Sequence, residues 1–191
     1  MQTTTEQLFD NAHTANLYFD KPVDDALLHQ LYDMMKFGPT SANCSPARIQ
    51  FVKSAAAKAK LVACMIDSNV QKTQSAPVTA IIGMDMQFYD KLPELFVHTD
   101  ARAWFVGNQP SIDATAFRNS SLQGGYFIVA ARALGLGCGP MSGFDAAKLD
   151  AAFWNGTHVK TNFVCTLGYA DHSKTFARNK RLSFDQACTI V

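Results

Sequence analysis

The apolar positions of this chain follow two patterns, helical spacing in some segments and short continuous runs in others. Apolar residues recur three and four positions apart after Pro22-Val23-Asp24, which predicts a helix that Gly38-Pro39 ends. The same spacing over about 111–134 predicts a long helix with Gly124-Gly125 inside it. Because an interior glycine costs about 1 kcal/mol relative to alanine, this pair indicates either close approach of another backbone, such as a partner helix, or a tolerated kink.

Continuous apolar runs over residues 77–84 and 162–169 predict buried strands, and residues 49–52 predict another strand. The segment 85–108 is irregular and rich in aromatic residues, which is typical of a lid or an insertion. Further helices are expected over residues 5–16, 55–64 and 144–153, the last with Asp145 as its N-cap, and a short amphipathic tail over 183–191. The alternation of strands with helices predicts a layered domain of both, with the strand direction left open.

Length and composition predict one domain that spans residues 1–191. Hydrophobic residues make up 48% of the chain, enough for a substantial core, and charged residues only 17%, too few for a large disordered tail. The formal net charge of +1 argues against a strongly basic nucleic-acid-binding protein and against an acidic solvating protein.

Cysteine and histidine usage narrows the chemistry further. The five cysteines are odd in number, widely spaced and without a C-x-x-C pair, which favours reduced thiols over a disulfide scaffold. No two histidines lie three or four positions apart, so a helical histidine-pair metal site is not expected. The polar N-terminus resembles no signal peptide and no apolar run reaches about 18 residues, so we expect a cytoplasmic protein outside the membrane.

Two loops could bind a ligand. Residues 38–48 offer hydroxyls, an amide and backbone donors between prolines, a set that can bond the edge of a planar heterocycle. The alternative is an ordinary turn, which composition alone favours. Residues 135–144 are glycine-rich and could place bare backbone amides against a ligand, or could equally be a helix cap and a connection. They follow a helix, so they are not the dinucleotide-binding fingerprint.

The basic residues Lys174, Arg178, Lys180 and Arg181 form the best candidate anion site on the chain. The alternative is a solvated surface, the commoner meaning of a charge run. Nucleophilic catalysis has little support, because there is no G-x-S-x-G elbow. Cys44 is the one thiol worth testing for reactivity, and a small loop residue is the favoured interpretation.

In their order and spacing these segments resemble the FMN-dependent nitroreductase family over nearly the whole chain. The matching pieces are Ala12–Asn16, the P-T-S-A-N-C-S-P loop at Pro39–Pro46, Gly135–Phe144 and Arg178–Arg181. Longer strings resemble one subfamily, the malonic semialdehyde reductases of pyrimidine degradation. They are Phe37–Ile49, Asn69–Thr73, Ala76–Ile81, Phe117–Ser121 and Gly139–Asp145.

The resemblance implies an α+β fold, a three-layer α-β-α sandwich whose sheet is mixed but mostly antiparallel, in an intertwined homodimer with two FMN molecules at the interface. It implies ping-pong hydride transfer from NADH or NADPH through flavin N5 to a small-molecule substrate, with malonic semialdehyde reduced to 3-hydroxypropionate. A broad-specificity NAD(P)H nitro/quinone reductase is the alternative, and a flavin-binding protein without turnover is a third interpretation. The preference between NADH and NADPH is left open.

The resemblance also implies roles for individual residues. The cofactor set is His13, Thr14 and Asn16 along the phosphate and ring edge; Pro39, Thr40, Ser41, Asn43 and Ser45 from the other subunit; Asn69 and Lys72 at the pyrimidine end; Pro140, Met141, Ser142 and Gly143 near N5 and O4; and Lys174, Arg178 and Arg181 on the phosphate. Lys72 would also stabilise negative charge on the reduced ring. Arg48 and Arg102 are candidates to bind a substrate carboxylate, with a surface or dimer salt bridge as the rival role.

The chain departs from the family pattern at three positions. Ala12 stands where the family has arginine, Asn16 where it has a basic residue, and Ser45 where it has glutamine. The resemblance therefore implies that the phosphate and ring charge depend more heavily on His13, Lys72 and Arg178.

Overall fold

A four-stranded sheet forms the centre of the protein. The computed structural model describes residues 4–191, except for the side chain of Lys174. The strands are β1 (Ala47–Val52), β2 (Val78–Asp85), β3 (Gly137–Met141) and β4 (Val159–Gly168). They lie in the order β1-β2-β4-β3, and every neighbouring pair is antiparallel. The expected mixed sheet is therefore antiparallel throughout its four strands, and a parallel contact is confined to the single bridge between Thr14 and Cys138.

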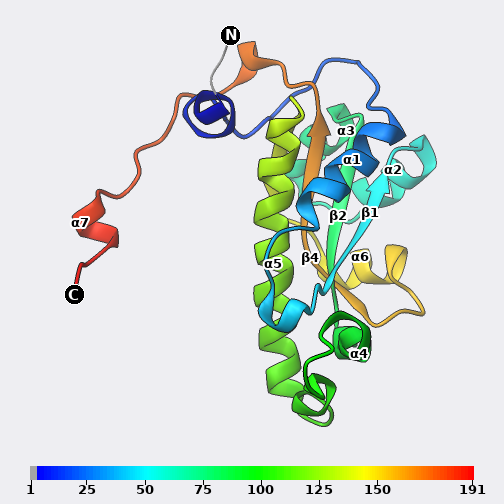
Figure 1. Ribbon diagram of the computed structural model, residues 1–191. Helices are drawn as coiled ribbons and strands as arrows, with labels where there is room; N and C mark the ends of the chain where they lie inside the picture. The colour runs from blue at the N-terminus through cyan, green and yellow to red at the C-terminus, as the bar shows by residue number, and fades with distance from the viewer. Residues whose placement is uncertain (1–3) are drawn as a thin grey trace.

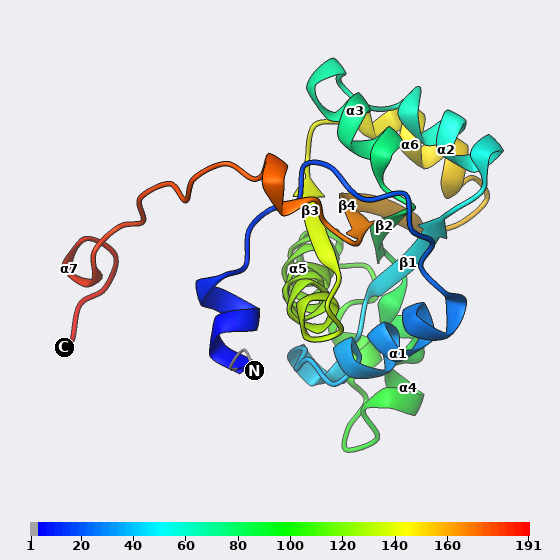
Figure 2. The ribbon, with the colours of Figure 1, turned by 90° about the horizontal axis from the view of Figure 1, so that it is seen from above.

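Helices cover both faces of the sheet, as Figures 1 and 2 show. They are α1 (Asp25–Met35), α2 (Ala55–Val62), α3 (Asp67–Ser75), α4 (Leu92–Leu95), α5 (Gln109–Ala133), α6 (Ala146–Phe153) and α7 (Phe184–Ala187). One buried cluster joins α1 and α5 to the sheet, and another joins α2 and α6 to its opposite face. The three-layer α-β-α architecture is confirmed.

The central strand β2 explains why its apolar run is continuous. Successive side chains of a strand point to opposite faces. Val78, Ala80 and Ile82 enter the cluster with α1 and α5, whereas Ile81 enters the cluster with α2 and α6. Both faces are covered, so the strand needs apolar residues at consecutive positions even though its neighbours are antiparallel.

The long helix α5 passes close to the sheet at Gly124. A Cβ atom there would lie 2.5 Å from the ring of Phe163 on β4, whereas a Cβ at Gly125 would meet no atom within 4 Å. The first glycine thus permits close approach, and it does so against the sheet of its own subunit. A partner helix at Gly125 stays a prediction.

Three predicted segments differ in the structure. The helix expected over 5–16 is a π-helix at Glu6–Asp10 that ends early, because the following residues extend along β3 and Ala15 N–H donates to the carbonyl of Cys138 (3.0 Å). Residues 137–141, expected to be a connection, form β3. Helix α3 was not predicted, since its residues are polar. In each case pairing or packing with distant residues outweighs the local pattern.

The N-cap expected for α6 is confirmed. Asp145 caps α6 by accepting a hydrogen bond of 3.0 Å from the Lys148 backbone. The aromatic segment 85–108 contains short helical turns around a buried cluster that includes Phe88, Leu92 and Phe105. The last residues, from about 175 onward, leave the domain as an extended arm that carries α7 (Figures 1 and 2).

Candidate functional site

Strand β3 lies at the edge of the sheet and gathers several of the predicted cofactor residues. On its outer side the segment that holds His13, Thr14 and Asn16 runs alongside, bonded at Cys138. At its end lie Pro140, Met141, Ser142 and Gly143. Pro140, Met141 and Ser142 line a shallow cavity of about 380 Å³ together with Gly125 and Phe163. The glycine-rich segment is thus a strand end that faces α5.

Helix α3 places Asn69 and Lys72 at the same end of β3. The Asn69 side chain donates a hydrogen bond of 3.1 Å to the carbonyl of Gly143. A Cβ atom at Gly139 would lie 3.2 Å from Cδ of Lys72 and 2.7 Å from the carbonyl of Ala15. Glycine at this position therefore lets the lysine stem cross β3 beside the N-terminal segment.

Lys72 is half-buried, and burial lowers the pKa of its ammonium group. Among the residues that the structure describes, no carboxylate forms an ion pair with it. A desolvated cation without a partner is a favourable place for negative charge on a ligand. This is the strongest electrostatic feature at the end of β3.

The C-terminal arm returns basic residues to the N-terminal segment. His13, Thr14, Asn16, Arg178 and Arg181 line one cavity of about 440 Å³. Nη2 of Arg178 donates to the carbonyls of Phe9, Asp10 and Ala12 at 2.7 to 3.2 Å. Most of the residues predicted to lie at the phosphate thus line one cavity within one chain, while the side chain of Lys174 lies outside the described residues.

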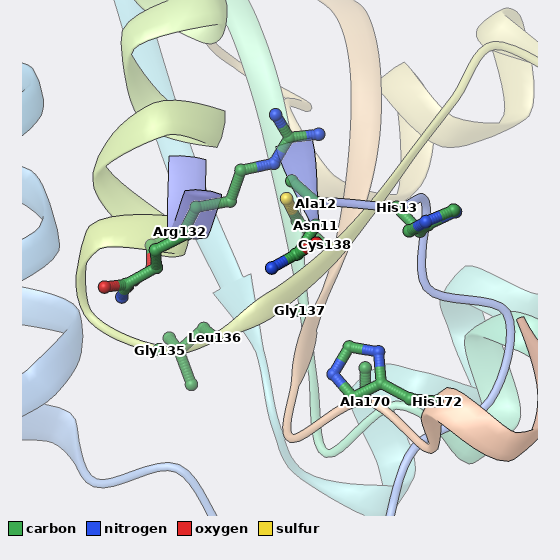
Figure 3. Close-up of a pocket in the computed structure, with 11 residues that line it drawn as sticks. Asn11, Ala12, His13, Arg132, Gly135, Leu136, Gly137, Cys138, Ala170 and His172 are labelled. Carbon is green, nitrogen blue, oxygen red and sulfur yellow. Dashed lines mark hydrogen bonds between the residues drawn. The ribbon is translucent and has the colours of Figure 1, made fainter. Parts of the chain in front are cut away.

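Sequence reasoning missed Arg132, in the last turn of α5. It lines the cavity just described and also a second one of about 470 Å³, which Ala12, His13 and Cys138 line as well. Figure 3 shows its side chain extending from α5 toward Ala12 and Cys138. The pKa of Cys138 is lowered, first by the neighbouring thiol of Cys165 and further by this guanidinium. Nothing in the local sequence distinguishes Arg132 from an ordinary basic residue at a helix C-terminus.

The loop from Pro39 to Ser45 lies elsewhere, beside the middle of α5. The Ser41 N–H donates to Oδ1 of Asn119 (2.8 Å) and the Ala47 N–H donates to Oε1 of Gln123 (2.8 Å). Thr40 accepts a bond of 3.1 Å from the Ser45 N–H, and the Asn43 side chain donates to the carbonyl of Leu95 (2.9 Å). None of the loop residues lines the cavities that contain His13 or Pro140. The structure therefore does not bring this loop to the other predicted cofactor residues within one chain.

The two arginines expected to bind a substrate carboxylate both have carboxylate partners. Arg48 pairs with Asp85 at 2.6 Å, and Arg102 pairs with Asp90 at 2.8 Å. The rival role as salt bridges is thus present in the subunit. A role in substrate binding stays a prediction that competes with these pairs.

Cys44 is buried at 1% exposure, and burial raises the pKa of its thiol to about 11. A thiol that stays protonated at neutral pH is a poor nucleophile. The structure supports the small loop residue over the reactive thiol.

Among the described residues no group of three or more histidine, cysteine, aspartate or glutamate side chains could hold a metal ion. Within residues 4–191 no helix is both long and apolar enough to cross a bilayer.

Comparisons with known proteins identify the class of protein, a flavin-dependent oxidoreductase, and its family. The Nitroreductase family model matches residues 13–169, so the chain belongs to the nitroreductase family. A Burkholderia lata protein is 60% identical over 97% of this chain and 95% of its own. A Ralstonia nicotianae protein is 57% identical over 97% and 95%. Both carry the provisional name NADH dehydrogenase/NAD(P)H nitroreductase.

Two solved structures show the same fold at low identity. A nitroreductase-like protein of Exiguobacterium sibiricum, solved in complex with FMN, superposes with a TM-score of 0.87 and 16% identity over 100% of this chain and 98% of its own. A Staphylococcus epidermidis protein, described as an NAD(P)H:FMN oxidoreductase, gives a TM-score of 0.84 and 18% identity over 100% and 97%.

Proposed function

We propose that this protein is an FMN-dependent NAD(P)H oxidoreductase of the nitroreductase type. The observation that carries the proposal is that the N-terminal segment meets Lys72 at Gly139 of β3 and also lines a cavity with Arg178 of the C-terminal arm. Lys72 is a half-buried cation that has no ion pair among the described residues. The names of the relatives and the FMN complex of a protein with the same fold support it.

The residues present fit an anionic planar cofactor. Lys72 offers an uncompensated charge, and the carbonyl-bonded Asn69 is oriented by Gly143. His13 and Arg178 offer donors at the cavity where a phosphate would lie. When bound, FMN supplies two-electron chemistry, accepting a hydride from NAD(P)H and passing it to an acceptor. The protein supplies binding, orientation and a positive field, and no protein nucleophile is required.

We further propose that the functional unit is an intertwined homodimer. The loop at Pro39–Ser45 lies apart from the other predicted cofactor residues of its own subunit. In a homodimer, the same loop of the second subunit would complete the site. The arm exposes Phe176, Leu182, Phe184, Ile190 and Val191, and α5 exposes Phe117, Leu122 and Tyr126. Large exposed apolar surface on one subunit is typical of a surface that associates. Light scattering should give about twice the chain mass of 20.9 kDa, and removal of residues 183–191 should raise the monomer fraction.

The activity is tested by the visible spectrum of the purified protein, recorded without oxygen before and after addition of NADH or NADPH. We expect a flavin spectrum that bleaches and that returns when a nitroaromatic acceptor is added. Flavin that neither nucleotide bleaches would support a binding protein without turnover. A colourless protein that also fails to take up added FMN would overturn the proposal.

Reduction of malonic semialdehyde is the more specific candidate activity. It is supported by the strings at Phe37–Ile49, Asn69–Thr73 and Gly139–Asp145, which resemble the semialdehyde reductases. The names of the relatives favour the broader nitroreductase activity. The ratio of kcat/KM for malonic semialdehyde to that for a nitroaromatic separates the two. Loss of both Arg48 and Arg102 without loss of aldehyde reduction would remove the proposed carboxylate site.

A further inference from the structure

We propose that Arg132 binds the phosphate of the cofactor, an inference that rests on the proposed function and deepens it. The residue comes from the last turn of α5, outside the segments in which the sequence predicts phosphate ligands. It is the cation at the junction of the two cavities beside the N-terminal segment.

The position of Arg132 is the first argument. The two cavities, of about 470 and 440 Å³, share Ala12, His13 and Arg132. The second cavity also contains Thr14, Asn16, Arg178 and Arg181, the set in which a phosphate is expected. Arg132 therefore faces the same space as the predicted phosphate ligands.

The uncompensated charge of Arg132 is the second argument. Its Nη1 donates to the carbonyl of Leu8 (2.9 Å), but its Nε is buried and has no hydrogen-bond partner. Within residues 4–191 the structure shows no ion pair to this guanidinium. The charge of this guanidinium is therefore uncompensated within the described residues, and a phosphate in the adjoining cavity would neutralise it.

The third argument is that one guanidinium nitrogen of each neighbouring arginine is already engaged by carbonyls. Nη2 of Arg178 already donates to three carbonyls, and Nη1 of Arg181 donates to the carbonyls of Asn179 and Lys180. Ala12 lines both cavities and contributes only a methyl group to them. Arg132 extends toward this small residue (Figure 3) and can bring a positive charge to the cavities from α5.

The competing role is structural. A basic residue in the last helical turn interacts favourably with the helix dipole, and the Leu8 bond ties the N-terminal helix to α5. Gln7 makes a similar tie, donating to the carbonyl of Arg132 at 2.8 Å. A structural role would affect every flavin alike, whereas a phosphate ligand distinguishes FMN from riboflavin, which lacks the phosphate.

The test compares dissociation constants for FMN and riboflavin, measured by quenching of flavin fluorescence on the full-length protein stripped of flavin. Arg132→Gln should weaken FMN binding about tenfold or more and leave riboflavin binding within about twofold. Arg132→Lys should restore part of the FMN preference because it keeps the charge. Lys148→Gln removes the same charge from an exposed residue of α6 and should change neither constant.

The outcomes separate this inference from the proposed function. Equal weakening of FMN and riboflavin by Arg132→Gln, with a lower melting temperature, would assign the residue a structural role and overturn the inference. Unchanged FMN binding in that variant would overturn it as well. A wild-type protein that binds neither flavin would instead overturn the proposed function.

Discussion

The backbone N–H of Ser41 donates a hydrogen bond of 2.8 Å to Oδ1 of Asn119, a residue that is 1% exposed in the middle of α5. The amide of Asn119 is oriented because its Nδ2 donates to the carbonyl of Thr115 (2.9 Å). The bonded loop contains Ala42 and Asn43 at positive φ, a conformation that costs non-glycine residues energy. A buried side chain on a rigid helix therefore holds a strained loop in place.

Asn119→Ala should release this loop. The variant leaves the Ser41 N–H without its acceptor, so we expect a loss of about 1–3 kcal/mol in the free energy of unfolding. Because the loop is proposed to contact the cofactor in the dimer, the dissociation constant for FMN should also rise, by about tenfold. Urea unfolding and flavin fluorescence measure the two effects.

Ser120→Ala is the matched control for Asn119→Ala. Ser120 is also buried on α5, but its hydroxyl accepts a bond of 2.7 Å from Asn162 on β4 and does not touch the loop. This variant should lower stability and leave FMN affinity unchanged. If the two variants weaken FMN binding equally, Asn119 does not position the loop.

Lys72→Met should stabilise the flavin-free protein and weaken its binding of FMN. Burial lowers the pKa of Lys72, so folding of the flavin-free protein disfavours its charged form. Removing the charge should raise the melting temperature of the flavin-free protein and weaken FMN binding several-fold. Lys160→Met, at an exposed position on β4, should change neither.

The stability that Lys72→Met gains over the wild type should depend on pH in one direction. Between the lowered pKa of the folded state and the ordinary lysine value of about 10.4, the unfolded chain binds more protons, so wild-type stability rises with pH. The advantage of Lys72→Met is therefore full near neutral pH and disappears as the pH rises through this window. An advantage that grows at high pH would contradict the assignment.

The sequence predicts the layers better than it predicts the edge of the sheet. Both continuous apolar runs are central strands, and α5 and α6 lie close to their predicted bounds. These elements are defined by burial, which leaves a clear pattern. Strand β3 has none, because Gly137 and Gly139 permit close approach of neighbouring residues and, like Pro140, have low strand propensity.

The candidate site also contains residues that the sequence predicts and residues that only the fold reveals. The family resemblance implies that His13, Asn69, Lys72 and Arg178 contact one cofactor. The structure places His13 and Arg178 at one cavity and Asn69 and Lys72 at the end of β3. Asn119 and Arg132 carry no local signal, since a buried amide and a terminal arginine on a helix are common for structural reasons alone. Their roles depend on which distant backbone lies beside them, which only the fold determines.

Thiol labelling tests the accessibility of the cysteines. Cys44, Cys64, Cys138 and Cys165 are buried and Cys188 is exposed. With the pKa of Cys44 raised to about 11, we expect iodoacetamide at pH 8 to leave Cys44 unmodified in the native protein and to modify it in the urea-unfolded protein. Peptide mass spectrometry identifies the sites, with urea-unfolded protein and Cys188→Ser as controls. Rapid labelling of Cys44 in folded Cys188→Ser would contradict this account.

Variants of Arg48 and of Asp85, its ion-pair partner, test whether Arg48 binds a substrate carboxylate. Its Nη2 pairs with Asp85 at 2.6 Å, and its Nη1 donates to the carbonyls of Ser45 (3.0 Å) and Ala47 (2.9 Å). We expect Arg48→Gln and Asp85→Asn each to lower stability, with a coupling of about 1 kcal/mol in the double variant. Both should change KM for malonic semialdehyde and for a nitroaromatic by the same factor. If Arg48 instead binds a substrate carboxylate, Arg48→Gln should raise KM for the semialdehyde alone, whereas Asp85→Asn, which frees the guanidinium, should lower it.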